Sequence, residues 1–330
     1  GFASGSGSSG GGGGRGRGGG STRLPMHSLS TMSSRGRGVA TKLDGSMVTG
    51  AAEQIRKGYG SRQLASKFGN PHATSCWLST FFQFIWHSPH IHDALTQRLR
   101  EVGPGDTNVI NVLRLTWGAA YDRSRRLQTT PNKNRKYMRA EYGMEYMRAE
   151  WHDPNRSTAR GCGDPFDALT ILLTVVLPDS NLITRVIAHD GHSGAFNQAM
   201  VDNGYMMPPI VCVSLGGLKQ RRTSWNSTRW PTHVDNVYGY GSYEIISIMI
   251  RVKRNHWLSF VRVIGTLNSW RLFNDTQRDS TFRTYTDKQV KKWIKSRKKN
   301  IEVAHIIYES TRRGGGRSVM GGAAAGGGGG

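Results

Sequence analysis

The sequence has little cysteine, little acid and no long apolar run. Its 330 residues include only three cysteines, Cys76, Cys162 and Cys212, and none has Cys-x-x-Cys spacing. We therefore expect no disulfide framework, no structural zinc and no other cofactor, and a reducing compartment such as the cytoplasm or nucleus. The longest apolar stretch, near residues 168–177, is far shorter than the roughly 20 residues that cross a bilayer, so we expect no membrane segment.

Acidic residues are outnumbered, 22 against 45 lysines and arginines, which gives a formal net charge of +23. Without the eight arginines of its two ends, the chain still carries +15. Such a charge attracts polyanions. Residues 287–299 predict a basic amphipathic helix, whose cations lie between Lys288 and Lys299. We expect this helix and the Gly/Arg tract near the amino end to contact RNA or an acidic partner, with a solvated helix face as the alternative.

Glycine is unevenly distributed, since most of the 43 glycines lie near the two ends. Residues 1–41 and 312–330 are low-complexity tails that lack the apolar side chains needed to form a core, so we expect them to be disordered. Residues 42–311 form the predicted folded domain, with a basic insertion or loop at about 122–160. Because the first residue is glycine, we expect a fragment whose targeting segment would be hidden.

The remaining pattern changes from helical to extended along the chain. Helical periodicity predicts helices at residues 50–67, 76–86, 93–102, 108–121 and 166–176. Apolar, β-branched runs between turn residues predict strands at 182–188, 209–215, 243–252, 257–264, 270–273 and 301–308. A helical lobe followed by an antiparallel sheet is an α+β arrangement, and a cleft between the two would bring Cys76 against His256.

Cys76 comes directly before an aromatic and aliphatic run that ends at Trp86. A thiol at the start of a buried helix lies near unpaired backbone N–H groups and the positive end of the helix dipole. Both favour the thiolate, which is the nucleophilic form. The alternative is a buried cysteine that acts as a small apolar side chain.

His256 opens an alternating stretch, and a second stretch begins at Trp270 after a turn containing Gly265 and Asn268. The two read as a β-hairpin that places His256 opposite Asn274, with Asp275 one register step away. Opposed residues have Cβ atoms about 5 Å apart, close enough for an amide or carboxylate to orient an imidazole. The alternative is a surface histidine.

Three sequence boxes follow one another along the chain. The cysteine box reads NPHATSCWL from Asn70, the middle box reads GDPFDAL from Gly163, and the histidine box comprises HWLSF from His256 and WRLFND from Trp270. In this order they resemble the boxes of the ubiquitin-specific proteases, a family of papain-like cysteine hydrolases. The resemblance covers roughly residues 65–310. It implies a papain-like fold in which a helical lobe carries the nucleophile and a sheet lobe carries the histidine.

The resemblance also implies roles for these residues. Cys76 would be the nucleophile, His256 the base, and Asn274 or Asp275 its orienter. Asn70 or His72 would stabilise the oxyanion. The partner would be ubiquitin or a ubiquitin-like protein.

The middle box has two readings. In the family, its acidic residues hold the arginines of the substrate's tail, which gives Asp164 and Asp167 a substrate-binding role. Both also suit a helix cap, since acidic side chains in a first turn favour the dipole. The two readings are compatible.

Three functions follow from these observations. The first is a cysteine-type deubiquitinase. The second is a catalytically impaired scaffold of the same fold, because Ser79 stands where the family usually has asparagine. The third is an RNA-associated protein with a structural hydrolase-like core. Two histidine groups, the first at 87, 90 and 92 and the second at 189 and 192, are interpreted as exposed loop residues rather than metal ligands.

Overall fold

A computed structural model describes residues 45–58, 76–129, 163–178, 180–187, 191–215, 230–252, 256–263, 268–274, 283–297 and 300–312, without the side chains of 123–129. The predicted amino-terminal tail, the carboxyl-terminal tail from residue 313 onward and most of the predicted insertion lie outside these ranges. Helix α4 continues to Thr129, so the first residues of the predicted insertion or loop are helical.

Most helices precede most strands, as predicted. The helices are α1 (Gly45–Arg56), α2 (Cys76–His87), α3 (Pro89–Leu99), α4 (Asn108–Thr129), α6 (Pro165–Ile171), the π-helical turn η3 (Leu172–Val176), α7 (His192–Asp202), the 3₁₀ turn η4 (Val237–Gly239) and α8 (Asp287–Arg297). None of the helices within the described ranges is long and apolar enough to cross a membrane.

The break between α2 and α3 is a single residue, Ser88. Its side chain accepts a hydrogen bond from the N–H of Ile91 at 3.3 Å, and Pro89 occupies the first helical turn. Serine is a strong N-cap and proline needs no hydrogen-bond partner there. Helix α3 therefore begins four residues before the predicted position at Asp93.

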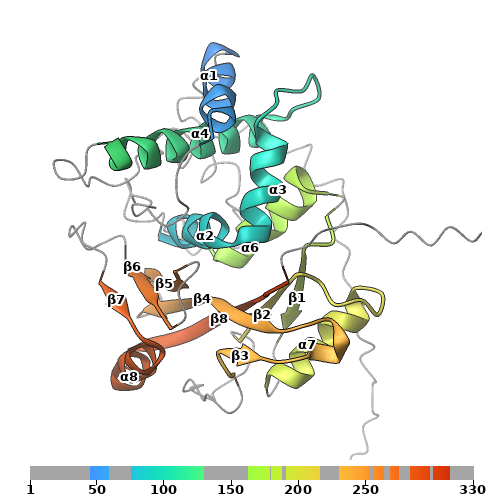
Figure 1. Ribbon diagram of the computed structural model, residues 1–330, viewed down its shortest axis with the longest axis vertical. Helices are drawn as coiled ribbons and strands as arrows, with labels where there is room; N and C mark the ends of the chain where they lie inside the picture. Colours follow the sequence, from blue (N-terminus) through green and yellow to red (C-terminus); the bar gives the residue numbers. More distant parts are fainter. Residues whose placement is uncertain are drawn as a thin grey trace, which may run out of the picture. The chain divides into compact units, whose positions relative to one another are not determined.

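The strands form one eight-stranded sheet with the order β1-β2-β8-β4-β5-β6-β7, and β3 pairs with β4 (Figure 1). Their bounds are β1 (Ile183–Ile187), β2 (Ile210–Ser214), β3 (His233–Val234), β4 (Tyr243–Val252), β5 (His256–Arg262), β6 (Trp270–Phe273), β7 (Thr284–Tyr285) and β8 (Ile301–Ser310). The fold is therefore α+β.

The sheet is mixed, and the expectation of a purely antiparallel sheet is wrong. Strands β1 and β2 are parallel, with Ile183 paired to Ile210. Helix α7, which we did not predict, connects them. Parallel neighbours need such a crossover because a tight turn reverses the chain direction.

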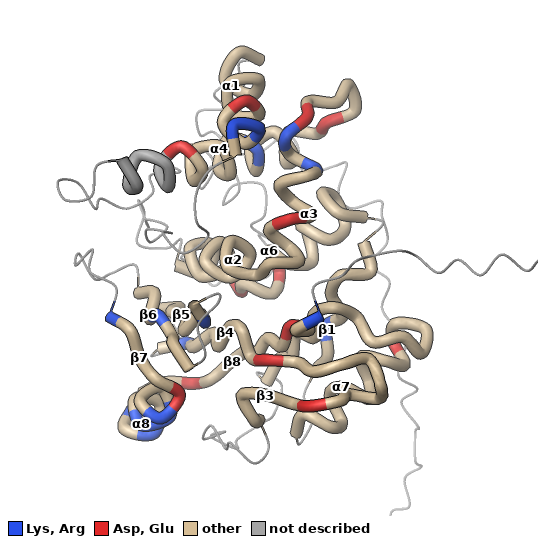
Figure 2. Tube along the Cα trace, viewed as in Figure 1, with Lys and Arg blue, Asp and Glu red and all other residues tan. Residues whose placement is uncertain are grey.

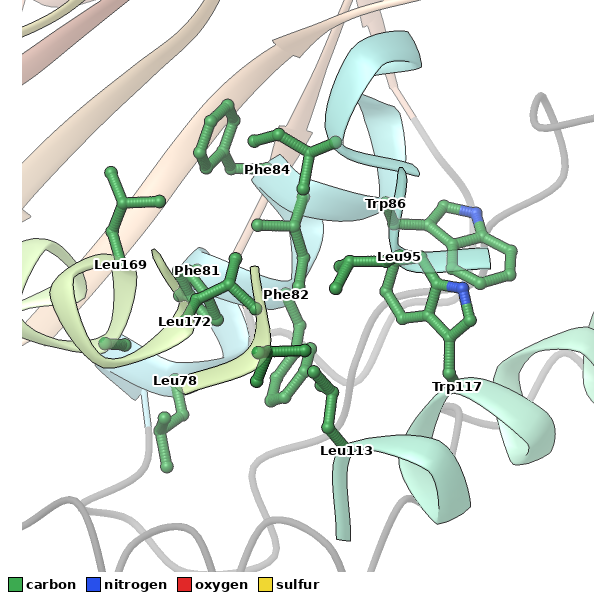
Figure 3. Close-up of a cluster of buried hydrophobic side chains, with 14 of the residues drawn as sticks. Leu78, Phe81, Phe82, Phe84, Trp86, Leu95, Leu113, Trp117, Leu169 and Leu172 are labelled. Carbon is green, nitrogen blue, oxygen red and sulfur yellow. The ribbon is translucent and has the colours of Figure 1, made fainter. Parts of the chain in front are cut away.

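Two apolar clusters cover the two faces of the sheet. One joins α2, α3, α4 and α6 to sheet residues that include Met249 and Trp257, and Figure 3 shows its aromatic centre around Phe82 and Trp117. The other joins α7 and α8 to residues that include Leu258 and Phe260. Strand β5 thus supplies alternate side chains to both clusters, as the period of two in a strand requires.

Candidate active site

The histidine box forms the predicted hydrogen bond. His256 is the first residue of β5, and Asn274 directly follows β6. The Nε2 of His256 lies 2.8 Å from the Oδ1 of Asn274. The turn residue Asn268 has φ 62°, a left-handed conformation that asparagine tolerates.

The register differs from the predicted one by two residues. Ser259 pairs with Phe273, whereas the predicted register pairs it with Arg271. A two-residue shift keeps each side chain on the same face of the sheet, while a one-residue shift would reverse it. His256 and Asn274 are therefore diagonal rather than directly opposed, and their side chains still meet. Asp275, the other predicted orienter, lies outside the described residues.

The bond to Asn274 determines which nitrogen of His256 carries the proton. An amide oxygen only accepts, so the Nε2 of His256 donates. In a neutral imidazole the other nitrogen, Nδ1, then holds the lone pair. Nδ1 is consequently the atom at which this ring accepts a proton.

Cys76 is the first residue of α2, as predicted, and its thiol is free of any disulfide. Helix α2 packs against β5, the strand that His256 begins, and against β4. Cys76 is 0% exposed. The predicted oxyanion residues, Asn70 and His72, lie outside the described ranges.

The middle box lies directly against the cysteine box. A Cβ built on Gly163 would stand 2.7 Å from the indole ring of Trp77, the neighbour of Cys76, so only glycine fits this contact without displacement. The next residue, Asp164, is the N-cap of α6 and accepts a hydrogen bond from the N–H of Phe166 at 2.9 Å. The predicted capping role is therefore confirmed for Asp164.

Asp164 has a second partner that the sequence did not indicate. The Nε2 of His305, in β8, donates a hydrogen bond to its Oδ1 at 2.8 Å. Burial alone would raise the pKa of the Asp164 carboxyl. The hydrogen bond and charge of His305, the N–H of Phe166 and the nearby Arg185 together hold that pKa below its usual value. Asp164 is thus an ionised carboxylate whose side chain is 41% exposed.

Asp167, the other predicted substrate-binding acid, lies in the first turn of α6. Its backbone N–H donates to the carbonyl of Asp164 at 2.9 Å. Substrate contact by Asp164 and Asp167 stays a prediction.

His305 connects the middle box to the histidine box. Its ring is stacked on Phe166 of α6 at 4.5 Å and on Trp257 of β5 at 5.6 Å, with interplanar angles of 5° and 6°. Trp257 follows the candidate base His256. The sequence signal for His305 was a histidine within the otherwise apolar run from Val303 to Ile307, and a buried polar side chain of this kind needs a partner.

Helix α2 carries buried polar side chains that sequence analysis missed. Cys76, Thr80, Gln83 and His87 recur at helical spacing, and all are buried. The Nδ1 of His87 donates to the carbonyl of Gln83 at 2.7 Å. Its Nε2 and both side-chain amide atoms of Gln83 have no hydrogen-bond partner among the described residues. Burial lowers the pKa of His87 to about 4. The hydrogen bond to Gln83 raises this pKa in part, and the charge of Arg271 lowers it further.

The interpretation of the first histidine group as exposed loop residues is wrong. His87 ends α2 and His92 lies in α3, and both are buried. In the second group, His192 begins α7 and His189 lies outside the described ranges. Across the described residues, no three histidine, cysteine or acidic side chains gather as metal ligands.

The other two cysteines differ from Cys76. Cys212 lies in β2 and is buried, and burial raises the pKa of its thiol well above the usual value. It is therefore a neutral thiol within the sheet. Cys162 lies outside the described residues.

No family model and no curated protein matches the chain. Among solved structures, it is similar to the Ubp8-Sgf11-Sgf73-Sus1 SAGA DUB module, with 13% identity and a TM-score of 0.44 over 75% of this chain and 68% of that one. It is also similar to the Saccharomyces cerevisiae PAN2 pseudoubiquitin-hydrolase-RNase module, with 10% identity and a TM-score of 0.44 over 75% of this chain and 53% of that one. The chain thus spans about half of the second structure. Function has to be argued from the site itself.

Proposed function

We propose that the chain is a cysteine-type deubiquitinase of papain-like fold. It hydrolyses the peptide or isopeptide bond after the C-terminal glycine of ubiquitin or a ubiquitin-like modifier. The observation that carries this proposal is the 2.8 Å bond between the Nε2 of His256 and the Oδ1 of Asn274. It is the bond between base and orienter that the three-box resemblance implies, and it leaves Nδ1 as the acceptor for a thiol proton.

The reaction follows from these groups. The Nδ1 of His256 takes the proton of Cys76, and the sulfur attacks the carbonyl carbon of the C-terminal glycine. Asn70 or His72 donates to the oxyanion. The imidazolium, oriented by Asn274, gives its proton to the departing lysine amine, which leaves a thioester. His256 then deprotonates a water molecule that attacks the thioester, and the proton returns to the sulfur.

Further observations support this reading. Cys76 begins a helix that packs on the strand begun by His256. Gly163 fits closely against Trp77, so the middle box meets the cysteine box at the start of α2. His305 stacks on Phe166 of the middle box and on Trp257 of the histidine box. The half-exposed carboxylate of Asp164, together with Asp167, suits the arginines of a modifier's tail. A thiol nucleophile that forms no disulfide also suits the reducing cytoplasm or nucleus.

Two observations favour a second candidate, a catalytically impaired scaffold that binds the modifier without cleaving it. Cys76 is 0% exposed, and Ser79 replaces the asparagine that the family usually carries. A deubiquitinase with this site requires substrate binding to uncover the sulfur. A scaffold does not.

The experiment that separates the two is reaction with ubiquitin carrying a C-terminal propargylamide, an electrophile that traps a catalytic thiol. We expect a covalent adduct with the natural chain and none with Cys76→Ala. Cys212→Ala is the matched control and should react like the natural chain. Asn274→Ala should slow the reaction, and Asn274→Asp should restore it, because a carboxylate also accepts from Nε2.

Two outcomes would contradict the deubiquitinase. Binding to ubiquitin with no adduct would establish the scaffold instead. Neither adduct nor binding, with the thermal unfolding of each variant unchanged, would overturn both candidates.

A further inference from the structure

Helix α8 packs on the face of the sheet that carries Leu258 and Phe260, and it presents a row of cations. It packs inward through Val290 and Ile294, each 2% exposed, and through the Trp293 ring, which lies 5.2 Å from Phe260 of β5. Figure 2 shows basic residues gathered on this helix. We define the α8 patch by its cationic residues, Arg283, Lys288, Lys291, Lys292, Lys295 and Arg297.

Within the described ranges, no acidic side chain forms an ion pair with a cation of the α8 patch. Among the residues that the structure describes, none of the four lysines forms an ion pair or a hydrogen bond. The acid of the helix, Asp287, accepts a hydrogen bond from the indole N–H of Trp270. By contrast, Arg56 and Lys57 at the end of α1 pair with Glu53 at 3.3 and 3.6 Å. The α8 lysines therefore remain available to an external anion.

The α8 patch also holds two flat cations against aromatic rings. The guanidinium of Arg297 lies 4.4 Å from the ring centre of Trp293, and that of Arg283 lies 5.4 Å from the ring centre of Tyr285. Both rings contact Phe260, Tyr285 at 5.4 Å and Trp293 at 5.2 Å. Since Phe260 is buried in the sheet, the two arginines rest on a rigid support. Both arginines are exposed, so each guanidinium remains accessible to a planar ligand.

We propose that the α8 patch binds single-stranded RNA. Lys288, Lys292 and Lys295 recur at helical spacing in a row about 10 Å long, which suits successive phosphates of one strand. The planes of Arg283 and Arg297 suit stacking with unpaired bases. An acidic protein would match the charge, but carboxylate side chains leave the flat surfaces without partners. This inference goes beyond the proposed function and does not depend on it.

The test is fluorescence anisotropy of a labelled 12-nucleotide single-stranded RNA with the full chain, between 50 and 200 mM salt. Lys288→Gln, Lys292→Gln and Lys295→Gln together should weaken binding by about tenfold and reduce the salt slope by about 2, since each phosphate contact contributes roughly 0.7. Arg297→Lys keeps the charge but loses the flat surface. It should weaken binding by about fivefold, within the range of one stacked base.

The matched control changes the same number of charges elsewhere. Arg56→Gln, Lys57→Gln and Arg100→Gln together neutralise three exposed cations that pair with Glu53 or Glu101. This variant should bind RNA within about twofold of the natural chain.

Two results would overturn the proposal. Equal weakening in the α8 and control variants would mean that net charge alone attracts the RNA. Competition by polyglutamate as strong as by unlabelled RNA, with no effect of Arg297→Lys, would identify an acidic protein as the partner. All these side chains are exposed or half-buried, and unchanged thermal unfolding would confirm that each variant folds.

Discussion

Helices α2 and α8 both pack on strand β5, yet one is enclosed and the other is a surface helix. All twelve residues of α2 are buried, polar ones included. In α8 only Val290 and Ile294 are buried out of eleven. The difference arises because α3, α4 and α6 also pack around α2, as its shared cluster with them shows (Figure 3).

Enclosure changes what a polar side chain does. On α8, lysines keep their water and impose no energetic penalty. On α2, the amide of Gln83 and the Nε2 of His87 lack hydrogen-bond partners within the described part of the chain, and each such group destabilises the fold by about 1–3 kcal/mol. The aromatic side chains of the same helix must offset this. The candidate nucleophile therefore lies on a helix that is buried on all sides, and the proposed RNA contact lies on a helix that is largely exposed.

The largest expected effect is on the enclosed helix. Phe82 is 0% exposed, and Phe82→Ala should lower the free energy of unfolding by about 3–5 kcal/mol because it leaves a cavity that neighbours on all sides hold open. Urea unfolding followed by circular dichroism measures this loss. Phe82→Leu, which keeps most of the volume, is the control and should lose less than about 1.5 kcal/mol. Equal losses in both variants would mean that α2 is not enclosed.

The next effect depends on pH. The pKa of His87 is about 4 in the folded chain because of burial, against about 6.5 when unfolded. As pH falls below 6.5 the unfolded chain takes up a proton that the folded chain takes up only near pH 4. The free energy of unfolding is therefore undiminished by His87 above pH 6.5. It falls by about 3 kcal/mol by pH 4, at roughly 1.4 kcal/mol for each pKa unit.

His87→Leu tests this by removing the titrating group while keeping an apolar side chain. The free energy of unfolding of the variant should fall less than that of the natural chain between pH 6.5 and 4. Urea unfolding at several pH values gives both curves. Parallel curves would show that His87 is protonated as easily in the folded chain as in the unfolded one.

The sequence predicted best those features that short-range periodicity determines. The bounds of β4 and β6 match the prediction, and α2 and α8 begin where it placed them. The face shared by His256 and Asn274 was also predictable, because alternation in a strand fixes it whatever the register. The register itself was not, because it depends on a turn that alternation does not specify.

Features that join distant segments were missed. Helix α7 has only three buried residues, Ala195, Phe196 and Ala199, and begins beside Gly191, so its pattern resembled a loop. The stack of His305 between Phe166 and Trp257 brings together three elements, and no local spacing encodes it. The enclosure of Cys76 likewise depends on which helices surround α2, which its own apolar run does not specify.

The smallest expected effects on the free energy of unfolding come from replacing one glutamine on α8 and one on α2. Gln289 of α8 accepts a hydrogen bond from the N–H of Thr286 at 2.8 Å and donates its own N–H to the Thr286 hydroxyl at 3.3 Å, a reciprocal capping box. Gln289→Met should therefore lower the free energy of unfolding by about 0.5–1 kcal/mol, although the residue is exposed.

Gln83 on α2 should behave in the opposite way. Both side-chain amide atoms are buried and have no hydrogen-bond partner in the ranges that the structure describes, so Gln83→Met replaces an unsatisfied polar group with an apolar one of similar size. The free energy of unfolding should stay within about 0.5 kcal/mol of the natural value or rise. The same urea titrations measure both variants. A loss above about 1 kcal/mol for Gln83→Met would mean that the amide is hydrogen-bonded in solution, and buried water beside α2 would then account for its polar side chains.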